Sequence, residues 1–175
     1  VVLVHDLIWK KCPSSMSLKS RCIERILFPH SVVNANHLVT VSKSTARDLI
    51  QYYPNVGDKI TTIYPASTFE QKRKRSSGNY ILFVGTFEPR KNILLLLRAY
   101  SEFVKLTGSK LQLYCVGHVG WGNLRLGREI RKRNLENLVK VVIGPTSDEL
   151  ADIYQNCLFL VLPSKYEGFG LTVVE

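Results

Sequence analysis

The stretch that decides the fold closes the chain: Leu158-Phe159-Leu160-Val161-Leu162-Pro163-Ser164-Lys165-Tyr166-Glu167-Gly168-Phe169-Gly170-Leu171-Thr172-Val173-Val174-Glu175. The apolar run 158–162 predicts a buried strand, which the following Pro-Ser pair ends. Glycines then open a loop before a helix that we expect to begin near Leu171. Backbone N–H groups can approach a phosphate where side chains are absent, and a helix N-terminus carries partial positive charge. The stretch therefore predicts a phosphate site, with Glu167 in the loop and Glu175 about one turn into the helix.

A second junction between a strand and a loop has the sequence Tyr80-Ile81-Leu82-Phe83-Val84-Gly85-Thr86-Phe87-Glu88-Pro89-Arg90-Lys91-Asn92. The apolar run ends at Gly85, and Lys91 precedes a helix whose Leu94, Leu97 and Tyr100 recur on one face. A lysine at such a junction can neutralise a diphosphate beside the helix N-terminus. A pair of surface cations beside a proline turn is the alternative interpretation.

Between these two stretches, the apolar runs 111–117 and 138–144 also end in glycine. Thr146 and Glu149 form a T-x-x-E capping box for a helix that we expect to end near Asn156. Alternating strands and helices predict an α/β fold with a parallel, doubly wound sheet and a ligand at the carboxyl ends of its strands. Three loops converge on that edge, at residues 85–92, 117–122 and 144–147.

These motifs together resemble the retaining GT-B-fold glycosyltransferases classed as glycosyltransferase family 4. The closing stretch is similar to the glutamate-x7-glutamate signature of that family, and the resemblance implies that Glu167 binds hydroxyls of the donor sugar and Glu175 the nucleotide ribose. It also implies that Lys91 contacts the donor phosphates. Many relatives carry an arginine directly after the first glycine, where this chain has Thr86. Whether Arg90 takes over that charge stays open.

The resemblance implies the rest of the site as well. It assigns catalytic roles to Lys91, Glu167 and His5, and places His5 close to the donor sugar across an interdomain cleft; helix capping by Asp6 explains the His-Asp pair as simply. The residues expected to bind substrate are Gly85, Thr86, Arg90, Gly117, His118, Gly144, Pro145, Thr146, Gly168, Phe169, Gly170, Leu171 and Glu175. The loop 144–146 is expected to border the nucleotide base. His118 either faces the cleft or is an ordinary loop histidine.

The chain is expected to contain parts of two Rossmann-like domains. Residues 1–66 are predicted to form the C-terminal part of an acceptor-side domain, with strands at 1–6 and 38–41, a helix capped by Ser42, and residues 59–65 leading toward the linker. Residues 67–79 form a basic linker. Residues 80–175 form most of the first half of a C-terminal, donor-binding domain. We therefore expect a fragment, truncated at both ends, that is inactive by itself.

The composition is that of a globular protein, with 45% hydrophobic and 22% charged residues. No apolar run approaches the roughly 18 residues of a membrane-spanning helix, and the N-terminus lacks the basic leader of a signal peptide. The four cysteines include no C-x-x-C pair, which favours free thiols in a reducing cytoplasm. No D-x-D sequence is present, so we expect donor binding without a metal or other cofactor.

The formal net charge of +10 is locally concentrated at residues 72–75 and 125–133. A basic surface attracts nucleic acid or anionic lipid. The second cluster has no interleaved aromatic residues for base stacking, so we interpret it as a solvated helix face and expect no nucleic-acid partner. The cluster at 72–75 suits peripheral contact with an anionic membrane at its cytoplasmic face.

The predicted function is transfer of a sugar, with retention, from a nucleoside-diphosphate sugar to an acceptor hydroxyl in polysaccharide or glycolipid biosynthesis. Residues 85–92 and 116–121 most resemble bacterial mannosyltransferases of surface-polysaccharide assembly, which makes GDP-mannose the first candidate donor and a glycan or lipid-linked glycan the acceptor. Two alternatives stay open: a nucleotide-sugar-binding module without turnover, and a basic nucleic-acid-binding protein.

Overall fold

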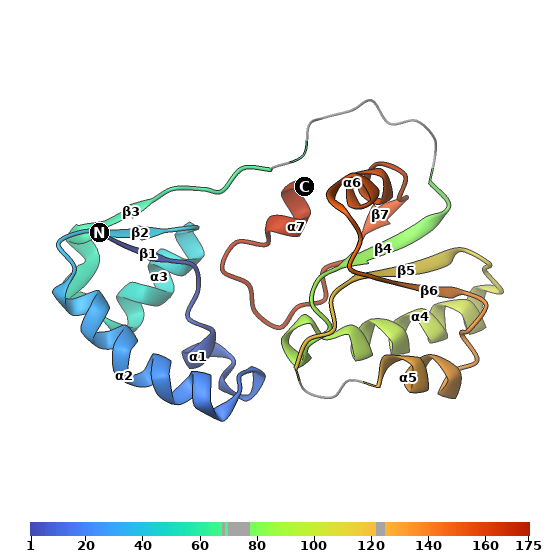
Figure 1. Cartoon of the computed structure of the whole chain (residues 1–175), viewed down its shortest axis with the longest axis horizontal. Helices are drawn as coiled ribbons and strands as arrows, with labels where there is room; N and C mark the ends of the chain where they lie inside the picture. The colour runs from blue at the N-terminus through green and yellow to red at the C-terminus, as the bar shows by residue number, and fades with distance from the viewer. Residues whose placement is uncertain (68, 70–77, 122–124) are drawn as a thin grey trace. The chain divides into compact units, whose positions relative to one another are not determined.

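The computed structural model describes residues 1–67, 69, 78–121 and 125–175. Its contacts divide the chain into two compact units, one of Val1–Ser67 with Tyr166–Val174 and one of Thr68–Lys165 with Glu175. Each unit contains its own parallel sheet (Figure 1). The main segment of the first unit ends at Ser67, and the closing segment 166–174 groups with this unit, whereas we expected it in the donor-binding domain from the sequence. The reason is a set of hydrogen bonds to the first unit. The predicted linker at 67–79, including the cluster 72–75, lies mostly outside the described residues.

The first unit contains a sheet of three short strands, β1 (Val2–Val4), β2 (Leu38–Thr40) and β3 (Ile60–Thr62), in that order. Their connections contain α1 (Ile8–Lys11), α2 (Leu18–Asn34) and α3 (Lys43–Tyr52), with 3-10 turns at Pro13–Ser15 and Pro54–Lys59. Apolar side chains from the strands and helices share one core, which includes Val4, Leu7, Val32, Leu38, Leu49 and Val56. All three strands are parallel, so their carboxyl ends meet at one edge.

The second unit alternates strands and helices: β4 (Tyr80–Val84), α4 (Ile93–Thr107), β5 (Gln112–Gly117), α5 (Leu126–Lys132), β6 (Val139–Ile143), α6 (Ser147–Gln155) and β7 (Phe159–Leu160). The strands are parallel and lie in the order β6-β5-β4-β7. The chain therefore adds strands outward from β4 on one side and then returns to add β7 on the other. A short helix, α7 (Leu171–Val174), closes the chain and belongs by its contacts to the first unit.

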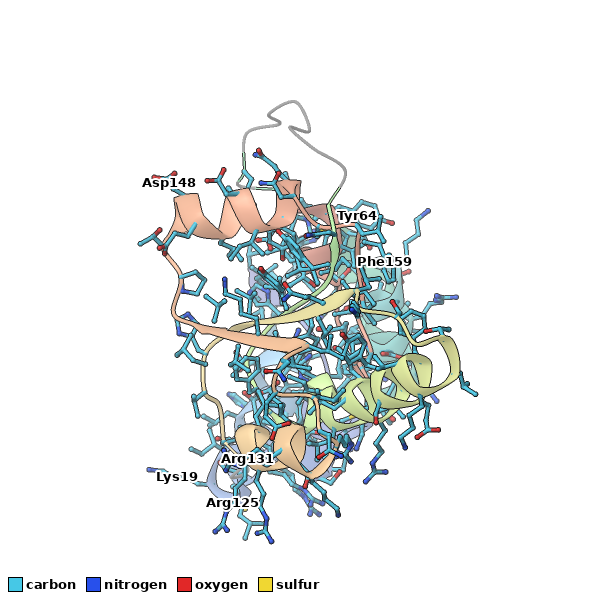
Figure 2. The ribbon with its side chains drawn as sticks, turned by 90° about the vertical axis from the view of Figure 1, so that its right-hand side faces the viewer. Lys19, Tyr64, Arg125, Arg131, Asp148 and Phe159 are labelled. Atoms are coloured by element: carbon cyan, nitrogen blue, oxygen red, sulfur yellow. The ribbon has the colours of Figure 1, made fainter. Side chains whose placement is uncertain are left out.

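Helices cover both faces of the second sheet, as predicted. Successive residues of a strand point to opposite faces, and β4 is buried at every position. Ile81 and Phe83 join a core with residues of α4 and α5, whereas Leu82 joins a core that includes residues of α6. Figure 2 shows this layering, with the sheet between α6 on one side and α4 and α5 on the other. A strand buried on both faces explains the continuous apolar run from Tyr80 to Val84.

Two predicted helix caps are confirmed. Ser42 precedes α3, and its hydroxyl accepts a hydrogen bond from the backbone N–H of Thr45 at 3.0 Å. Thr146 and Glu149 form the capping box of α6, with both reciprocal bonds present. The hydrogen bonds from the backbone and the hydroxyl of Thr146 hold the pKa of the Glu149 carboxyl below its ordinary value. Both helices thus begin where the sequence predicts.

Two details of the predicted core are wrong. The buried face of α4 consists of Ile93, Leu96, Leu97 and Tyr100, while Leu94 is only partly buried. The apolar run 158–162 gives a strand of only two residues, and the side chains flanking its start are exposed: Leu158 by 46% and Phe159 by 47%. Within the described part of the chain, β7 pairs with β4 alone, so it is an edge strand.

The basic residues of the 125–133 cluster mostly face solvent. Arg125, Arg128, Arg131 and Lys132 are exposed, and Figure 2 shows Arg125 and Arg131 on the outer side of this unit. Arg133 instead pairs with Glu129 at 2.5 Å. All four cysteines are free thiols, and burial raises the pKa of Cys115 to about 12. Across residues 1–67, 69, 78–121 and 125–175, no helix has both the length and the apolar character required to span a bilayer.

Candidate functional site

Three strands of the second unit end at a glycine on the same edge of the sheet. Gly85 follows β4, Gly117 ends β5, and Gly144 follows β6. The backbone N–H of Gly85 donates to the carbonyl of Val116 at 2.9 Å, and that of Gly144 donates to the carbonyl of Gly117 at 2.9 Å. These bonds keep the three strand ends in register. The three glycines that the sequence assigned to the substrate site are therefore together, at the carboxyl edge where α/β sheets bind their ligands.

Close contacts, with backbone in one case and with a side chain in the other, explain two of these glycines. A Cβ on Gly117 would lie 2.1 Å from the carbonyl oxygen of Gly85, which leaves no room for a side chain. Gly117 also has a φ of 149°, which residues with side chains rarely adopt. A Cβ on Gly85 would lie 3.3 Å from Cε of Lys91, so the aliphatic part of the lysine crosses over that glycine. Lys91, the predicted phosphate contact, is thus part of this glycine edge.

The loop that carries Lys91 is tied to the segment after β7. The backbone N–H of Lys165 donates to the carbonyl of Arg90 at 2.9 Å, and the side-chain amide of Asn92 donates to the carbonyl of Pro163 at 3.2 Å. Strands β4 and β7 are neighbours at the point where the order of strand addition reverses. Ligands of doubly wound sheets bind outside the carboxyl ends of the strands at such a reversal. The Lys91 loop therefore lies at the position where this architecture binds a ligand.

Arg90 has a different environment from that of Lys91. Its guanidinium donates to Glu88 Oε1 through Nε at 3.0 Å and through Nη2 at 2.8 Å. Only 15% of each of these two side chains is exposed. The Glu88 carboxylate therefore balances positive charge on Arg90. Thr86 occupies the position after Gly85 where many relatives have an arginine. Its methyl group lies near Gly120, and a Cβ on Gly120 would be 2.6 Å from that methyl carbon.

The remaining predicted residues of the second unit extend the edge from β5 to α6. His118 is exposed, and its carbonyl accepts a hydrogen bond from Phe87 N at 2.8 Å. A Cβ on Gly144 would lie 3.6 Å from Cε1 of the His118 ring, so these two residues are neighbours. Pro145 links Gly144 to Thr146, whose hydroxyl is engaged in the cap of α6. Residue 122, the end of the predicted loop 117–122, lies outside the described residues.

Glu175 contacts α6 in the second unit. The hydroxyl of Tyr154 donates to Glu175 Oε2 at 2.9 Å. Burial, with a further contribution from this hydrogen bond, raises the pKa of Tyr154 far above its ordinary value, so the tyrosine remains a donor at neutral pH. A nucleotide ribose would share the Glu175 carboxylate with this tyrosine.

The closing segment packs on the carboxyl ends of β1 and β2 in the first unit. Gly168 is buried, and a Cβ there would lie 1.9 Å from the carbonyl oxygen of His5. The carbonyl oxygen of Gly168 accepts hydrogen bonds from the hydroxyls of Ser42, at 2.5 Å, and Thr45, at 3.1 Å. The Phe169 ring lies 5.9 Å from that of Tyr64. The structure therefore brings His5, Gly168 and Phe169 together; Gly170, with φ of 86°, and Leu171 then lead into α7.

Tyr166 anchors the other side of Glu167. Its hydroxyl donates to Asp48 Oδ2 at 3.0 Å and accepts from the backbone N–H of Leu7 at 3.2 Å. Asp48 also pairs with Lys11 at 2.7 Å. Burial is the main cause that raises the pKa of Tyr166 well above its ordinary value, so its hydroxyl keeps its proton as a donor.

Sequence reasoning missed four of these residues as parts of a site. Ser42 was predicted only as a helix cap, and Thr45, Asp48 and Tyr166 received no role. Ser42, Thr45 and Asp48 recur at intervals of three residues from the N-cap of α3 into the helix, but nothing local indicates which distant segment they contact. The contacts assign Glu167 to the first unit and both Lys91 and Glu175 to the second. That these three residues act on one ligand stays a prediction.

Comparison with known proteins identifies the family. Residues 66–175 match the model of the family described as Glycosyl transferases group 1. The chain belongs to this family. The match extends from the end of the first unit's main segment through the glycine edge to the last residue, so it includes both stretches on which the resemblance rests.

Curated relatives of this group 1 glycosyltransferase chain include two O-antigen enzymes. The chain is 29% identical over 189 residues to the O-antigen chain mannosyltransferase B of Escherichia coli, covering 100% of this chain and 49% of the relative. It is 29% identical over 177 residues to the O-antigen chain mannosyltransferase RfbU of Salmonella typhimurium, covering 99% and 48%. The chain thus spans about half the length of the curated relatives it matches.

Solved structures confirm the predicted α/β fold of GT-B type. The chain matches the TarM G117R mutant of S. aureus, solved with Fondaparinux, alpha-GlcNAc-glycerol and UDP, with a TM-score of 0.75, 18% identity and coverage of 97% of this chain and 33% of that one. It matches Anabaena Alr3699/HepE, solved with UDP and glucose, with a TM-score of 0.74, 17% identity and coverage of 98% and 48%. At these identities the likeness concerns the fold.

Proposed function

We propose that the protein is a glycosyltransferase that moves mannose from a nucleoside-diphosphate sugar to an acceptor hydroxyl, with retention, in the synthesis of a polysaccharide. The observation that carries this proposal is the family match across residues 66–175, which contains the glycine edge and Lys91. The names of two relatives, both O-antigen chain mannosyltransferases, support mannose and a polysaccharide product. GDP-mannose is the proposed donor and a glycan, free or lipid-linked, the proposed acceptor.

The proposed chemistry follows from the charges that must separate. The bond between the sugar and the diphosphate breaks through a cationic, oxocarbenium-like sugar and a departing diphosphate anion. Preorganised cations and backbone N–H groups stabilise such a leaving group more effectively than water does. In this proposal the diphosphate binds beside Gly85, where the Lys91 side chain crosses the end of β4. The ammonium group then neutralises charge on the leaving phosphate as the bond breaks.

The roles proposed for the other site residues follow the family resemblance. Glu167 would hold hydroxyls of the donor sugar, and His5 would line the wall beside the sugar. Glu175 would bind the ribose, and the glycine-rich backbone of residues 168–171 would donate to the donor. No covalent nucleophile is assigned, and no metal is required: the leaving-group charge is met by Lys91 and backbone dipoles. The proposed setting is the cytoplasmic side of a membrane, with peripheral contact between the basic chain and anionic lipid.

Transfer assays on the full-length protein test this function. The protein is incubated with GDP-mannose, UDP-glucose or UDP-galactose and a mannose-terminated acceptor, with and without EDTA, and the anomeric configuration of the product is read by NMR. The proposal expects mannose transfer from GDP-mannose, with retention and without loss in EDTA. Binding of GDP-mannose with no transfer to any acceptor would instead favour the module without turnover. Inversion, or a clear preference for a UDP-sugar, would contradict the proposed mechanism or donor.

A further inference from the structure

Helix α3 contacts both residues that flank Glu167. Ser42 is the N-cap of α3, and Thr45 and Asp48 follow at intervals of three residues within its first turns, so each consecutive pair is adjacent on the helix surface. The hydroxyls of Ser42 and Thr45 donate to the carbonyl oxygen of Gly168, at 2.5 and 3.1 Å. The carboxylate of Asp48 accepts from the hydroxyl of Tyr166 at 3.0 Å. The residue before Glu167 and the residue after it are thus both held by the same helix.

These contacts are well suited to fix a backbone. Ser42 is 8% exposed and Thr45 is fully buried, so their hydrogen bonds do not compete with bulk water. Two donors saturate the two lone pairs of one carbonyl oxygen. The Ser42 hydroxyl also accepts from the Thr45 N–H at 3.0 Å, so the same oxygen both caps α3 and contacts Gly168. The carbonyl of His5 lies so close to Gly168 that the loop cannot slide toward β1.

We infer that Ser42, Thr45 and Asp48 are positioning residues that set the orientation of Glu167 for the transfer reaction. This inference rests on the proposed function, because it takes Glu167 as the residue that holds the donor sugar. The three residues touch neither sugar nor nucleotide in this account. They act through the backbone on either side of the glutamate, since a carboxylate must be held in place to bind a reacting sugar in its transition state.

Kinetics of the full-length protein test the inference through a double-mutant cycle. Ser42→Ala/Thr45→Val removes both donors to Gly168, and with two hydrogen bonds lost we expect kcat/KM for the donor to fall about tenfold. In a Glu167→Ala background the same pair of changes should alter kcat/KM by less than about twofold, because the group they position is gone. Full additivity in that background would overturn the inference. Ser44→Ala, on an exposed residue of the same helix, is the matched control and should leave transfer unchanged.

Two further variants separate positioning from helix capping. Ser42→Gly keeps most of the N-cap preference of this position but has no hydroxyl to donate to Gly168, so it should retain the unfolding temperature to within a few degrees and still lose transfer. Ser42→Thr keeps both functions and should restore activity to within about twofold of the wild type. If Ser42→Gly transfers sugar as well as the wild type does, the hydroxyl is not needed to position Glu167 and the inference fails.

Hydrogen exchange provides a readout that does not depend on activity. In Ser42→Ala/Thr45→Val, backbone amides of residues 166–170 should exchange at least about tenfold faster than in the wild type, while β4 and β5 keep their protection. Unchanged exchange in 166–170 would overturn the inference. If the wild type transfers no sugar, the proposed function fails, and the exchange measurement still decides whether α3 holds this loop.

Discussion

The two sheets of this chain share one architecture but differ at their carboxyl edges. In the second unit, strands β4, β5 and β6 end at glycines, and the groups at the edge are backbone atoms and the stem of Lys91. In the first unit, the edge formed by β1 and β2 is occupied by the chain's own segment around Gly168, held by hydroxyls of α3. A parallel sheet presents the same kind of edge in both cases. The two edges therefore differ in what lies against them: backbone and the Lys91 side chain in one, a segment of the chain itself in the other.

The largest expected effect concerns the cation at the glycine edge. Lys91→Ala in the full-length protein should lower kcat by about 100-fold or more, as expected for removal of a preorganised group that stabilises leaving-group charge. Lys105→Ala is the matched control: this lysine lies on α4, is 66% exposed and pairs only with Glu102 at 2.8 Å among the interactions described for it. Steady-state transfer assays compare the two variants. Similar transfer rates for Lys91→Ala and the wild type would show that Lys91, at the glycine edge of the second unit, does not stabilise the leaving group.

The next effect tests whether the glycine edge depends on the absence of side chains. Gly117→Ala places a Cβ 2.1 Å from the carbonyl oxygen of Gly85, so the ends of β4 and β5 must separate. We expect the free energy of unfolding to fall by at least about 2 kcal/mol. The control is Gly127→Ala in α5, where the nearest atom lies at 3.7 Å and alanine favours the helix. Denaturant unfolding should show the first change as destabilising and the second as neutral or stabilising; equal stabilities would contradict the close packing.

The third effect addresses the occupied edge of the first unit. Gly168→Ala puts a Cβ 1.9 Å from the carbonyl oxygen of His5 and must displace the loop next to Glu167. Transfer should fall about tenfold, equivalent to about 1.4 kcal/mol in the barrier. Nucleotide binding, which the account assigns mainly to the second unit, should change less, and calorimetric titration with GDP measures it. If Gly168→Ala lowers only the affinity for GDP and leaves the transfer rate unchanged, the loop at the first unit's edge binds nucleotide and does not position Glu167.

The smallest expected effect concerns the cap of α6, at the end of the second unit's edge. Thr146→Ala removes the cap of α6, and we expect a loss of about 1 kcal/mol in stability. Since hydrogen bonds from Thr146 lower the pKa of Glu149, the capping contribution is present above the ordinary pKa of a glutamate and is lost as pH falls through the lowered value. Unfolding measured at neutral and acidic pH should therefore show a difference between Thr146→Ala and the wild type that shrinks in acid. If the stability difference between Thr146→Ala and the wild type does not change with pH, the ionisation of Glu149 makes no contribution to the cap.

Much of the fold was predictable because its signals are local. Apolar runs that end in glycine gave β4, β5 and β6, and the Ser42 and Thr146 caps gave the starts of α3 and α6. The exposure of β7 was not predictable, since an apolar run does not reveal whether neighbours cover both sides of a strand. The choice of Ile93 and Leu96 over Leu94 on α4 depends likewise on how the helix rotates against the sheet.

The candidate site likewise has a part that local sequence predicts and a part that depends on contacts between distant residues. The neighbourhood of Gly85 and Lys91 follows from a loop only a few residues long, so the sequence indicates it directly. The contact between Gly168 and Ser42 joins residues 126 positions apart, and no periodicity or spacing encodes it. Asp48 shows the difficulty well: in the sequence it is one acid on a polar helix, and its function as an acceptor for Tyr166 appears only in three dimensions.

A crystal structure of the full-length protein with GDP bound tests the central claim most directly. The account predicts the diphosphate beside Gly85, with Lys91 Nζ and backbone N–H groups of the glycine edge within hydrogen-bond distance of its oxygens. A diphosphate bound away from the carboxyl ends of β4 and β7, with Lys91 making no contact to it, would contradict the account.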